Sequence, residues 1–263
     1  MFLEELKEFI RNFLIWIYFL LGSSFFFFFF GLKNIELLGK NWLLLAPTDY
    51  SLAVQILKKI QQDLLPTGVN LIVTNPLSAF LVQIMISLLL AFILTSPLLL
   101  YRLIKYLSPA LFKQEKKVVM GVLFPSVFLF LAGGLFAYLV LIPITFKILY
   151  SYTTAIGAIP YFSISEFITL VLSLMIATGV MFLLPVFMVL LAFWNLVKAD
   201  FWTDNWQYSL LFFLIFSAII TPDGTGITMI ILCLPLVGLY LSGCFITKKV
   251  EARKLRKFNH LNS

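Results

Sequence analysis

The sequence has few charged residues, and this scarcity determines the class of protein. Of its 263 residues, 12% are charged and 62% are hydrophobic, whereas a soluble domain carries about 25% charged and 45–50% apolar residues. No fold in water could cover so much apolar surface, so lipid must be the solvent for most of the chain. In such a protein the net charge of +7 does not indicate a nucleic-acid partner, and we expect none.

Residues that carry out chemistry are also scarce. The chain has one histidine, His260, and two cysteines, Cys233 and Cys244. On one helix these two cysteines would lie roughly 16 Å apart, whereas a disulfide needs Cα atoms within about 7 Å. The sequence contains no Walker loop, no HExxH and no Cys/His cluster. We therefore expect a protein that is not an enzyme and that binds no metal or cofactor.

Long apolar runs between the charges predict six membrane-spanning helices. A span needs about 20 apolar residues, and in lipid only helices or closed barrels satisfy the backbone. Continuous runs exclude the alternating pattern of a barrel. The expected helices lie near 11–31, 76–103, 117–146, 164–193, 206–221 and 227–246. The sequence thus predicts an all-α integral membrane protein, one polytopic domain over 1–263 that ends in a basic tail at 247–263.

Lysine and arginine predict the orientation, because they accumulate on the cytoplasmic side of a membrane. With six spans both termini share a side. That side carries most of the 19 basic residues, namely Lys7, Arg11, Arg102, Lys105, Lys113, Lys116, Lys117, Lys198, Lys248, Lys249, Arg253, Lys254, Arg256 and Lys257. The other side carries Lys33, Lys40, Lys58, Lys59 and Lys147. Both termini are therefore expected to face the cytoplasm, matrix or stroma.

The first outer loop, roughly 32–75, is long enough to contain an amphipathic helix. Thr48 and Asp49 could cap this helix at its start, and Lys58 and Lys59 would lie off its apolar face. The apolar face would carry Leu52, Ile56, Leu57, Ile60 and Leu64. We expect this face to pack against the rest of the protein, with the bilayer surface as the alternative.

Prolines and one aspartate are expected to shape the ends of the spans. Prolines bend or end helices because they lack a backbone donor, and those in the apolar runs are Pro97, Pro125, Pro143, Pro185 and Pro235. Asp223 follows Pro222 and precedes a glycine, which is favourable turn chemistry. It could cap the last span, and a role in assembly is the alternative.

Several motifs occur in a definite order along the chain. They are Thr95-Ser-Pro-Leu-Leu-Leu-Tyr-Arg102, Leu107-Ser-Pro-Ala-Leu-Phe-Lys-Gln-Glu-Lys-Lys117, Gly133-Gly-Leu-Phe-Ala-Tyr138 with Pro143, Gly179-Val-Met-Phe-Leu-Leu-Pro185 and Ile220-Thr-Pro-Asp223. In content and spacing this set resembles the TatC family, the signal-receptor subunits of the twin-arginine protein translocase. The resemblance covers nearly the whole chain. It implies a cup-shaped bundle with structural or assembly roles for Pro97, Pro109, Gly133, Phe136, Tyr138, Pro143, Pro185 and Asp223.

The resemblance also implies a function. TatC proteins recognise the twin-arginine signal peptides of folded precursor proteins, work with single-span TatA-type subunits in a translocase complex with several copies, and use the protonmotive force. By position, Glu5 and Glu115 correspond to signal-binding acids of the family, and guanidinium groups form bidentate bonds with carboxylates. Glu4 or Glu8 could substitute for Glu5. Glu115 could instead form a surface ion pair, of small energetic value, with a neighbouring lysine.

Two departures from the family pattern concern partner docking. Leu183 and Leu241 stand where the family commonly has glutamates within the fourth and sixth spans, and ionisable groups inside a membrane are normally functional. The receptor role is therefore better supported than partner docking. The alternatives are a secondary transporter, although such folds often carry internal repeats, and a structural subunit of an organellar complex.

The abundance of phenylalanine, 29 residues with Phe25 to Phe30 in one block, favours a gene in an AT-rich organelle genome. It points to the mitochondrial inner membrane, with the thylakoid or a bacterial inner membrane as alternatives.

Overall fold

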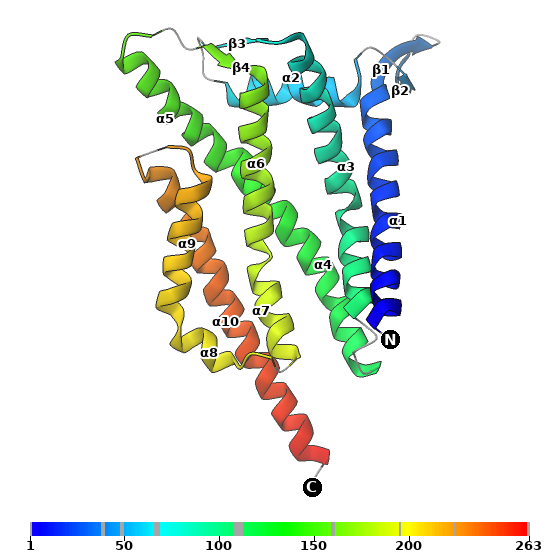
Figure 1. Ribbon diagram of the computed structural model, residues 1–263, viewed down its shortest axis with the longest axis vertical. Coiled ribbons are helices and arrows are strands. Elements are labelled where there is room, and N and C mark those ends of the chain that lie inside the picture. Colours follow the sequence, from blue (N-terminus) through cyan, green and yellow to red (C-terminus); the bar gives the residue numbers. More distant parts are fainter. Residues whose placement is uncertain are drawn as a thin grey trace. The chain divides into compact units, whose positions relative to one another are not determined.

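A computed structural model of the chain describes residues 2–37, 40–47, 50–65, 69–107, 113–158, 161–194, 196–223 and 225–261 (Figure 1). The chain divides into two compact units. The first contains residues 1–123 and 150–172, and the second contains residues 124–149 and 173–263.

Two antiparallel helices form the frame of the first unit. Helix α1 spans Phe2–Phe29 and packs against α3, which spans Pro76–Leu107. Phe28 near the end of α1 contacts Phe80 near the start of α3, with ring centroids 5.7 Å apart. Halfway along both helices, Trp16 contacts Phe92 at 6.2 Å. The amino end of α1 therefore lies at the same end of this unit as the carboxyl end of α3.

A β-hairpin and a helix connect α1 to α3. Strand β1, Phe30–Leu37, pairs antiparallel with β2, Lys40–Pro47, in a register that runs from Phe30↔Pro47 to Leu37↔Lys40. The all-α prediction did not include these strands. The hairpin lies beyond the apolar part of α1, where the backbone groups that leave the helix must find new partners.

The predicted amphipathic helix is confirmed as α2, Leu52–Leu64. It packs against α1, α3 and β1, so its apolar face meets protein as expected. Ile60 and Leu64 are buried, whereas Lys58 and Lys59 are exposed. The N-cap is Ser51, whose Oγ accepts a hydrogen bond from Val54 N at 3.4 Å. The caps predicted from the sequence, Thr48 and Asp49, lie outside the described residues.

A short parallel sheet joins two distant parts of the first unit. Strand β3, Asn70–Ile72, lies just before α3 and pairs with β4, Tyr161–Ser163. Helix α6, Ile164–Phe182, follows β4 directly. The sheet therefore holds the start of α6 beside the start of α3.

The remaining helices follow in chain order. Helix α4 spans Lys113–Phe136, a π-helical turn covers Ala137–Leu141, and α5 spans Ile142–Ala155. After α6 come α7, Leu184–Phe193, α8, Ala199–Asp204, α9, Trp206–Ile220, and α10, Ile227–Leu261. In the second unit α10 packs against α7, α8 and α9.

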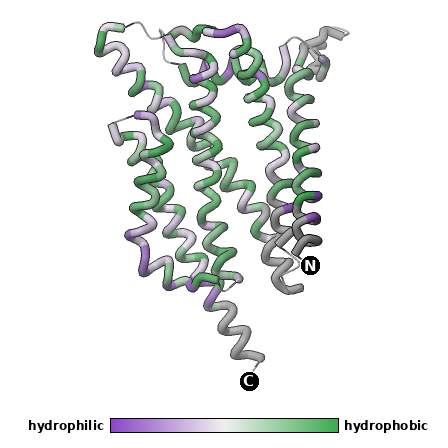
Figure 2. The backbone as a smooth tube through the Cα atoms, in the orientation of Figure 1, coloured by the Kyte–Doolittle hydropathy of each residue, from purple (hydrophilic) through white to green (hydrophobic). Residues whose placement is uncertain are grey.

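Length and hydropathy identify the candidate spans. In the described part of the chain, four helical stretches are long and apolar enough to cross a bilayer: Pro76–Leu99, Phe124–Ala155, Ile164–Phe193 and Ile227–Ala252. Two shorter apolar helices are Phe13–Phe29 and Trp206–Ile220. Each of the six overlaps one of the helices expected from the sequence, although Phe124–Ala155 is shifted toward the carboxyl end relative to the expected 117–146. Figure 2 shows hydrophobic residues along these stretches and hydrophilic ones in α2 and α8. Helix α10 continues to Leu261, through the segment predicted as a basic tail.

Candidate functional site

The two acids implied by the motifs, Glu5 and Glu115, both belong to the first unit. The backbone assigns Glu5 to the amino-terminal part of α1 and Glu115 to the first turn of α4. The side chains of both lie outside the described residues, as does Pro109. The connection from the end of α3 at Leu107 to Lys113 spans at most about 20 Å. The start of α4 therefore lies near the end of α3, which is also the end where α1 begins.

Helix α3 continues through Pro97, which was expected to bend or end it. A proline has no N–H, so the carbonyl of Ile93, one turn earlier, loses its usual donor. Ser96 Oγ donates to Ile93 O at 2.8 Å and replaces that hydrogen bond. Thr95 Oγ1 donates to Ala91 O, also at 2.8 Å. The hydroxyl next to Pro97 thus supplies the hydrogen bond that the proline removes. Backbone carbonyls inside a lipid-exposed helix need such a partner, because hydrocarbon offers none.

Gly133 lies where α4 and α6 cross with their backbones in contact. A Cβ atom on Gly133 would lie 2.8 Å from Thr178 O and 2.9 Å from Gly179 Cα. A Cβ atom on Gly179 would in turn lie 2.8 Å from the Phe130 ring. In the next turn of α4, Phe136 stacks on Phe182 of α6, with centroids 5.8 Å apart. Small residues permit such close helix approach in membranes, where dispersion contacts drive association.

Tyr138 and Pro143 lie in and just after the π-helical turn. The Ile142 N–H bonds to Ala137 O, five residues earlier. Pro143 cannot donate to the carbonyl four residues before it, and its ring crowds that carbonyl. The wider turn shifts the hydrogen-bond register by one residue and relieves this crowding. The chain therefore stays helical from α4 into α5.

Pro185 ends a helix, as predicted. Helix α6 stops at Phe182 and α7 starts at Leu184, with Leu183 between them. Leu183 N donates to Val180 O at 3.1 Å, three residues back, so the α-helical register is interrupted. Pro185 is buried, and a Cβ atom on Gly243 of α10 would lie 3.3 Å from its Cα. The break in the fourth expected span is therefore covered by α10.

Asp223 lies in the connection from α9 to α10, but it does not cap α10 directly. Its Oδ2 accepts a hydrogen bond from Thr225 Oγ1 at 2.5 Å. Thr225 Oγ1 then accepts from Ile227 N, the first residue of α10, at 3.3 Å. Asp223 is 5% exposed, and its Oδ1 has no hydrogen-bond partner among the residues that the structure describes. The aspartate therefore orients the threonine that caps the helix.

Glu251 makes a contact that was not predicted. Its Oε2 accepts a hydrogen bond from Ala199 N at 3.0 Å, at the first residue of α8. A carboxylate at this position satisfies a free helical N–H and complements the helix dipole. The acid therefore ties the extension of α10 to α8.

Replacing Glu251 by leucine is expected to loosen α8. The variant leaves Ala199 N without its acceptor, and loss of an N-terminal cap costs about 0.5–2 kcal/mol. Hydrogen–deuterium exchange of the purified protein should show faster exchange in peptides covering 199–204. Lys249→Gln, an exposed change on the same helix, should leave this exchange as it is. Equal exchange in the native chain, Glu251→Leu and Lys249→Gln would show that the stability of α8 does not depend on Glu251.

The sequence interpretation overlooked the roles of Ser96 and Glu251. A serine directly before a proline inside a span is a usable signal, because its hydroxyl can reach the carbonyl freed by that proline. Glu251 is an acidic residue within the segment predicted as a basic tail. Its partner, Ala199, is a backbone amide 52 residues earlier, and no sequence pattern identifies such a pairing.

Comparison with known proteins gives consistent matches. The family model described as "Sec-independent protein translocase protein (TatC)" matches residues 2–235. A TatC protein of Cenarchaeum symbiosum is 35% identical over 205 residues, 78% of each chain. The chloroplastic TATC of Pisum sativum is 31% identical over 200 residues, 76% of this chain and 56% of the relative. A crystal structure of the twin-arginine translocase receptor TatC superposes with a TM-score of 0.71 at 27% identity, covering 93% of this chain and 98% of that one.

Proposed function

Because this chain belongs to the TatC family, we propose that the end of its first unit where α1 and α4 begin binds the arginine pair of twin-arginine signal peptides. The chain is the receptor subunit of a Sec-independent twin-arginine translocase, a multi-pass membrane protein that transports other proteins and is not an enzyme. Family membership therefore excludes the two other functions considered from the sequence, that of a secondary transporter and that of a structural subunit.

The antiparallel arrangement of α1 and α3 supports this binding end. It puts the segment of α1 that carries Glu5 at the end of the unit where α3 finishes and α4 starts with Glu115. Two carboxylates at the end of the first unit where α1 and α4 begin match the two guanidinium groups that consecutive arginines of a signal peptide carry. Each arginine can form two parallel N–H···O bonds to a carboxylate, a geometry that lysine cannot reproduce.

The proposal predicts that Glu115→Ala weakens capture of a twin-arginine precursor by about tenfold or more. Hydrogen bonds to charged groups contribute about 1.5–3 kcal/mol, and 1.4 kcal/mol corresponds to a factor of ten in affinity. Co-purification of a tagged precursor with the detergent-solubilised protein measures this, and Glu5→Ala should behave in the same way. Exchanging Arg-Arg for Lys-Lys in the precursor should reduce binding to the native chain.

Glu166→Ala is the matched control. Glu166 is an exposed acid of the same unit, in the first turn of α6 beside the β3–β4 sheet, at the opposite end of α3 from the proposed site. Its loss should leave capture unchanged. Undiminished capture by both Glu115→Ala and Glu5→Ala would remove these acids from the site.

We further propose the partners and location that the resemblance implies. Single-span TatA-type subunits and further copies of this chain would complete the translocase. The mitochondrial inner membrane is proposed from the phenylalanine content, and the chloroplastic relative makes the thylakoid the main alternative. Tagging the chain and fractionating organelle membranes would separate the two.

A further inference from the structure

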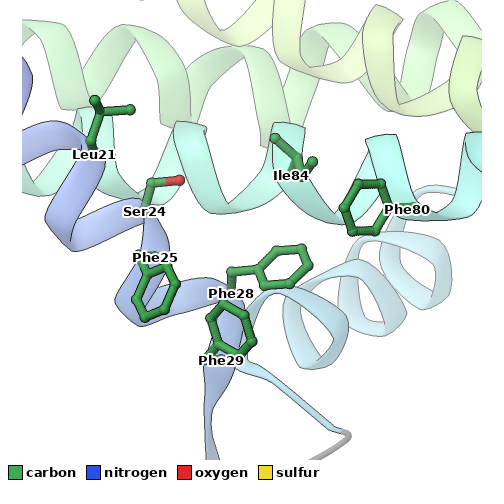
Figure 3. A pocket seen from close by; sticks show the side chains of 7 residues that line it. All are labelled: Leu21, Ser24, Phe25, Phe28, Phe29, Phe80 and Ile84. Atoms are coloured by element: carbon green, nitrogen blue, oxygen red, sulfur yellow. The ribbon is translucent and has the colours of Figure 1, made fainter.

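An apolar hollow lies between the second half of α1 and the start of α3 (Figure 3). Its volume is about 370 Å³. Phe28 of α1 and Phe80 of α3 meet edge to face along it, and Ile84 lies one turn further along α3. Ser24 is the one residue with a polar side chain among those that line it.

This hollow lies in helices that face hydrocarbon. Its lining belongs to the apolar stretches Phe13–Phe29 and Pro76–Leu99. Water does not occupy a space that offers so few polar partners, and an empty space would forfeit the dispersion contacts of its walls. The hollow therefore suits a slender apolar group, such as an acyl chain.

Helix α2 lies across the same two helices, near the end of α1 and the start of α3. Gln55 of α2 donates to the carbonyl of Leu32, just beyond the end of α1, at 2.9 Å. Gln83 of α3, next to Ile84 in the chain, donates to Ser51 Oγ at the N-cap of α2 at 2.8 Å. Figure 1 shows α2 crossing near these helix ends. These two hydrogen bonds hold the first turns of α2 close to the end of α1 and to the α3 residues that line the hollow.

The exposed side of α2 carries positive charge. Lys58 and Lys59 are exposed, and the one acidic residue of the helix is Asp63, one turn after Lys59. Lys58 Nζ lies 4.3 Å from the centroid of the Tyr50 ring. Tyr50 is itself exposed just before the helix, and tyrosine is enriched where hydrocarbon meets headgroups. Two ammonium groups at that level complement an anionic phosphate.

We propose that this part of the first unit is a binding site for an anionic phospholipid, with an acyl chain in the hollow between Phe28 and Phe80 and the phosphate at Lys58 and Lys59. Such a lipid would fill the hollow with its acyl chain and would contact α1, α2 and α3 together. The site is at the opposite end of α1 from Glu5, so it is independent of the proposed signal-peptide site.

Native mass spectrometry of the full chain tests this site. The protein would be taken from nanodiscs with equal amounts of palmitoyl-oleoyl phosphatidylglycerol and phosphatidylcholine. We expect retained phosphatidylglycerol to exceed phosphatidylcholine by about 25-fold, because each of the two lysines near an anionic lipid contributes roughly fivefold. The double variant Lys58→Gln/Lys59→Gln should lose most of this preference. Ile84→Trp, which fills the hollow, should reduce retention of both lipids.

The double variant Lys248→Gln/Lys249→Gln is the control, because it removes two exposed lysines from α10. It should retain phosphatidylglycerol like the native chain. The proposal fails if the native chain shows no preference, if the α2 variant keeps it, or if the control loses as much. The Lys58→Gln/Lys59→Gln variant alters only exposed side chains, so we expect it to fold. It therefore tests the proposed site even if Ile84→Trp does not fold.

Discussion

Replacing Gly133 by alanine is expected to separate α4 from α6 and to destabilise the second unit. The added methyl group would lie within 3 Å of two backbone atoms, Thr178 O and Gly179 Cα. Backbone atoms cannot rotate away as the end of a side chain can, so one helix must shift as a whole. Overpacking costs about 1–3 kcal/mol, and here the shift would also unstack Phe136 from Phe182.

The neighbouring Gly134 provides a matched control for this prediction. A Cβ atom on Gly134 would meet its nearest neighbours at 3.8 and 4.0 Å, which is ordinary contact. The thermal unfolding midpoint in one detergent should therefore fall clearly for Gly133→Ala and stay close to the native value for Gly134→Ala. Equal midpoints for the two variants would contradict the close crossing of α4 and α6.

Phe213→Ala is expected to have the second large effect. Phe213 is 1% exposed and packs edge to face against Tyr240 of α10, with centroids 5.8 Å apart. The Tyr240 hydroxyl in turn donates to the carbonyl of Trp202 in α8. Truncation opens a cavity at a contact that joins three helices. Water-soluble cores lose about 3–5 kcal/mol in such a change, and we expect about 2 kcal/mol here because lipid is as apolar as the core.

Replacement of Phe212, the preceding residue, is the control that distinguishes the loss of helix packing from the loss of a hydrophobic side chain. It is 53% exposed on the same helix, so lipid or detergent replaces its ring in Phe212→Ala. Unfolding with sodium dodecyl sulfate should show a lower midpoint for Phe213→Ala and little change for Phe212→Ala. If the two variants were equally affected, hydrophobic content and not helix contact would determine the stability of α9 and α10.

Charge spacing located the membrane helices well. Hydrocarbon excludes charge over about 20 residues, so each apolar run marks a span, and the fourth expected helix, 164–193, has the same limits as α6 and α7 together. The ends of other helices were less predictable. A helix can continue past its apolar part, as α10 does to Leu261, and charge spacing carries no information on where it stops.

Features that depend on distant partners could not be predicted. The β3–β4 pair joins Asn70 to Tyr161, and two three-residue strands have no periodicity to read. The π-helical turn before Pro143 and the relay from Asp223 through Thr225 depend on local geometry that several turn types could satisfy. In the candidate site, the family motifs supplied the positions of Glu5 and Glu115. Physics alone favoured an ordinary surface ion pair for Glu115.

The small parallel sheet constrains the order in which the protein can be assembled. Parallel strands need a long crossover between them, and here the crossover contains α3, α4 and α5. The first unit therefore remains incomplete until Tyr161–Ser163 has been synthesised. A nascent chain arrested before that point would contain α1 and α3 but would leave β3 without its partner strand, so closure of the first unit is a late step of assembly.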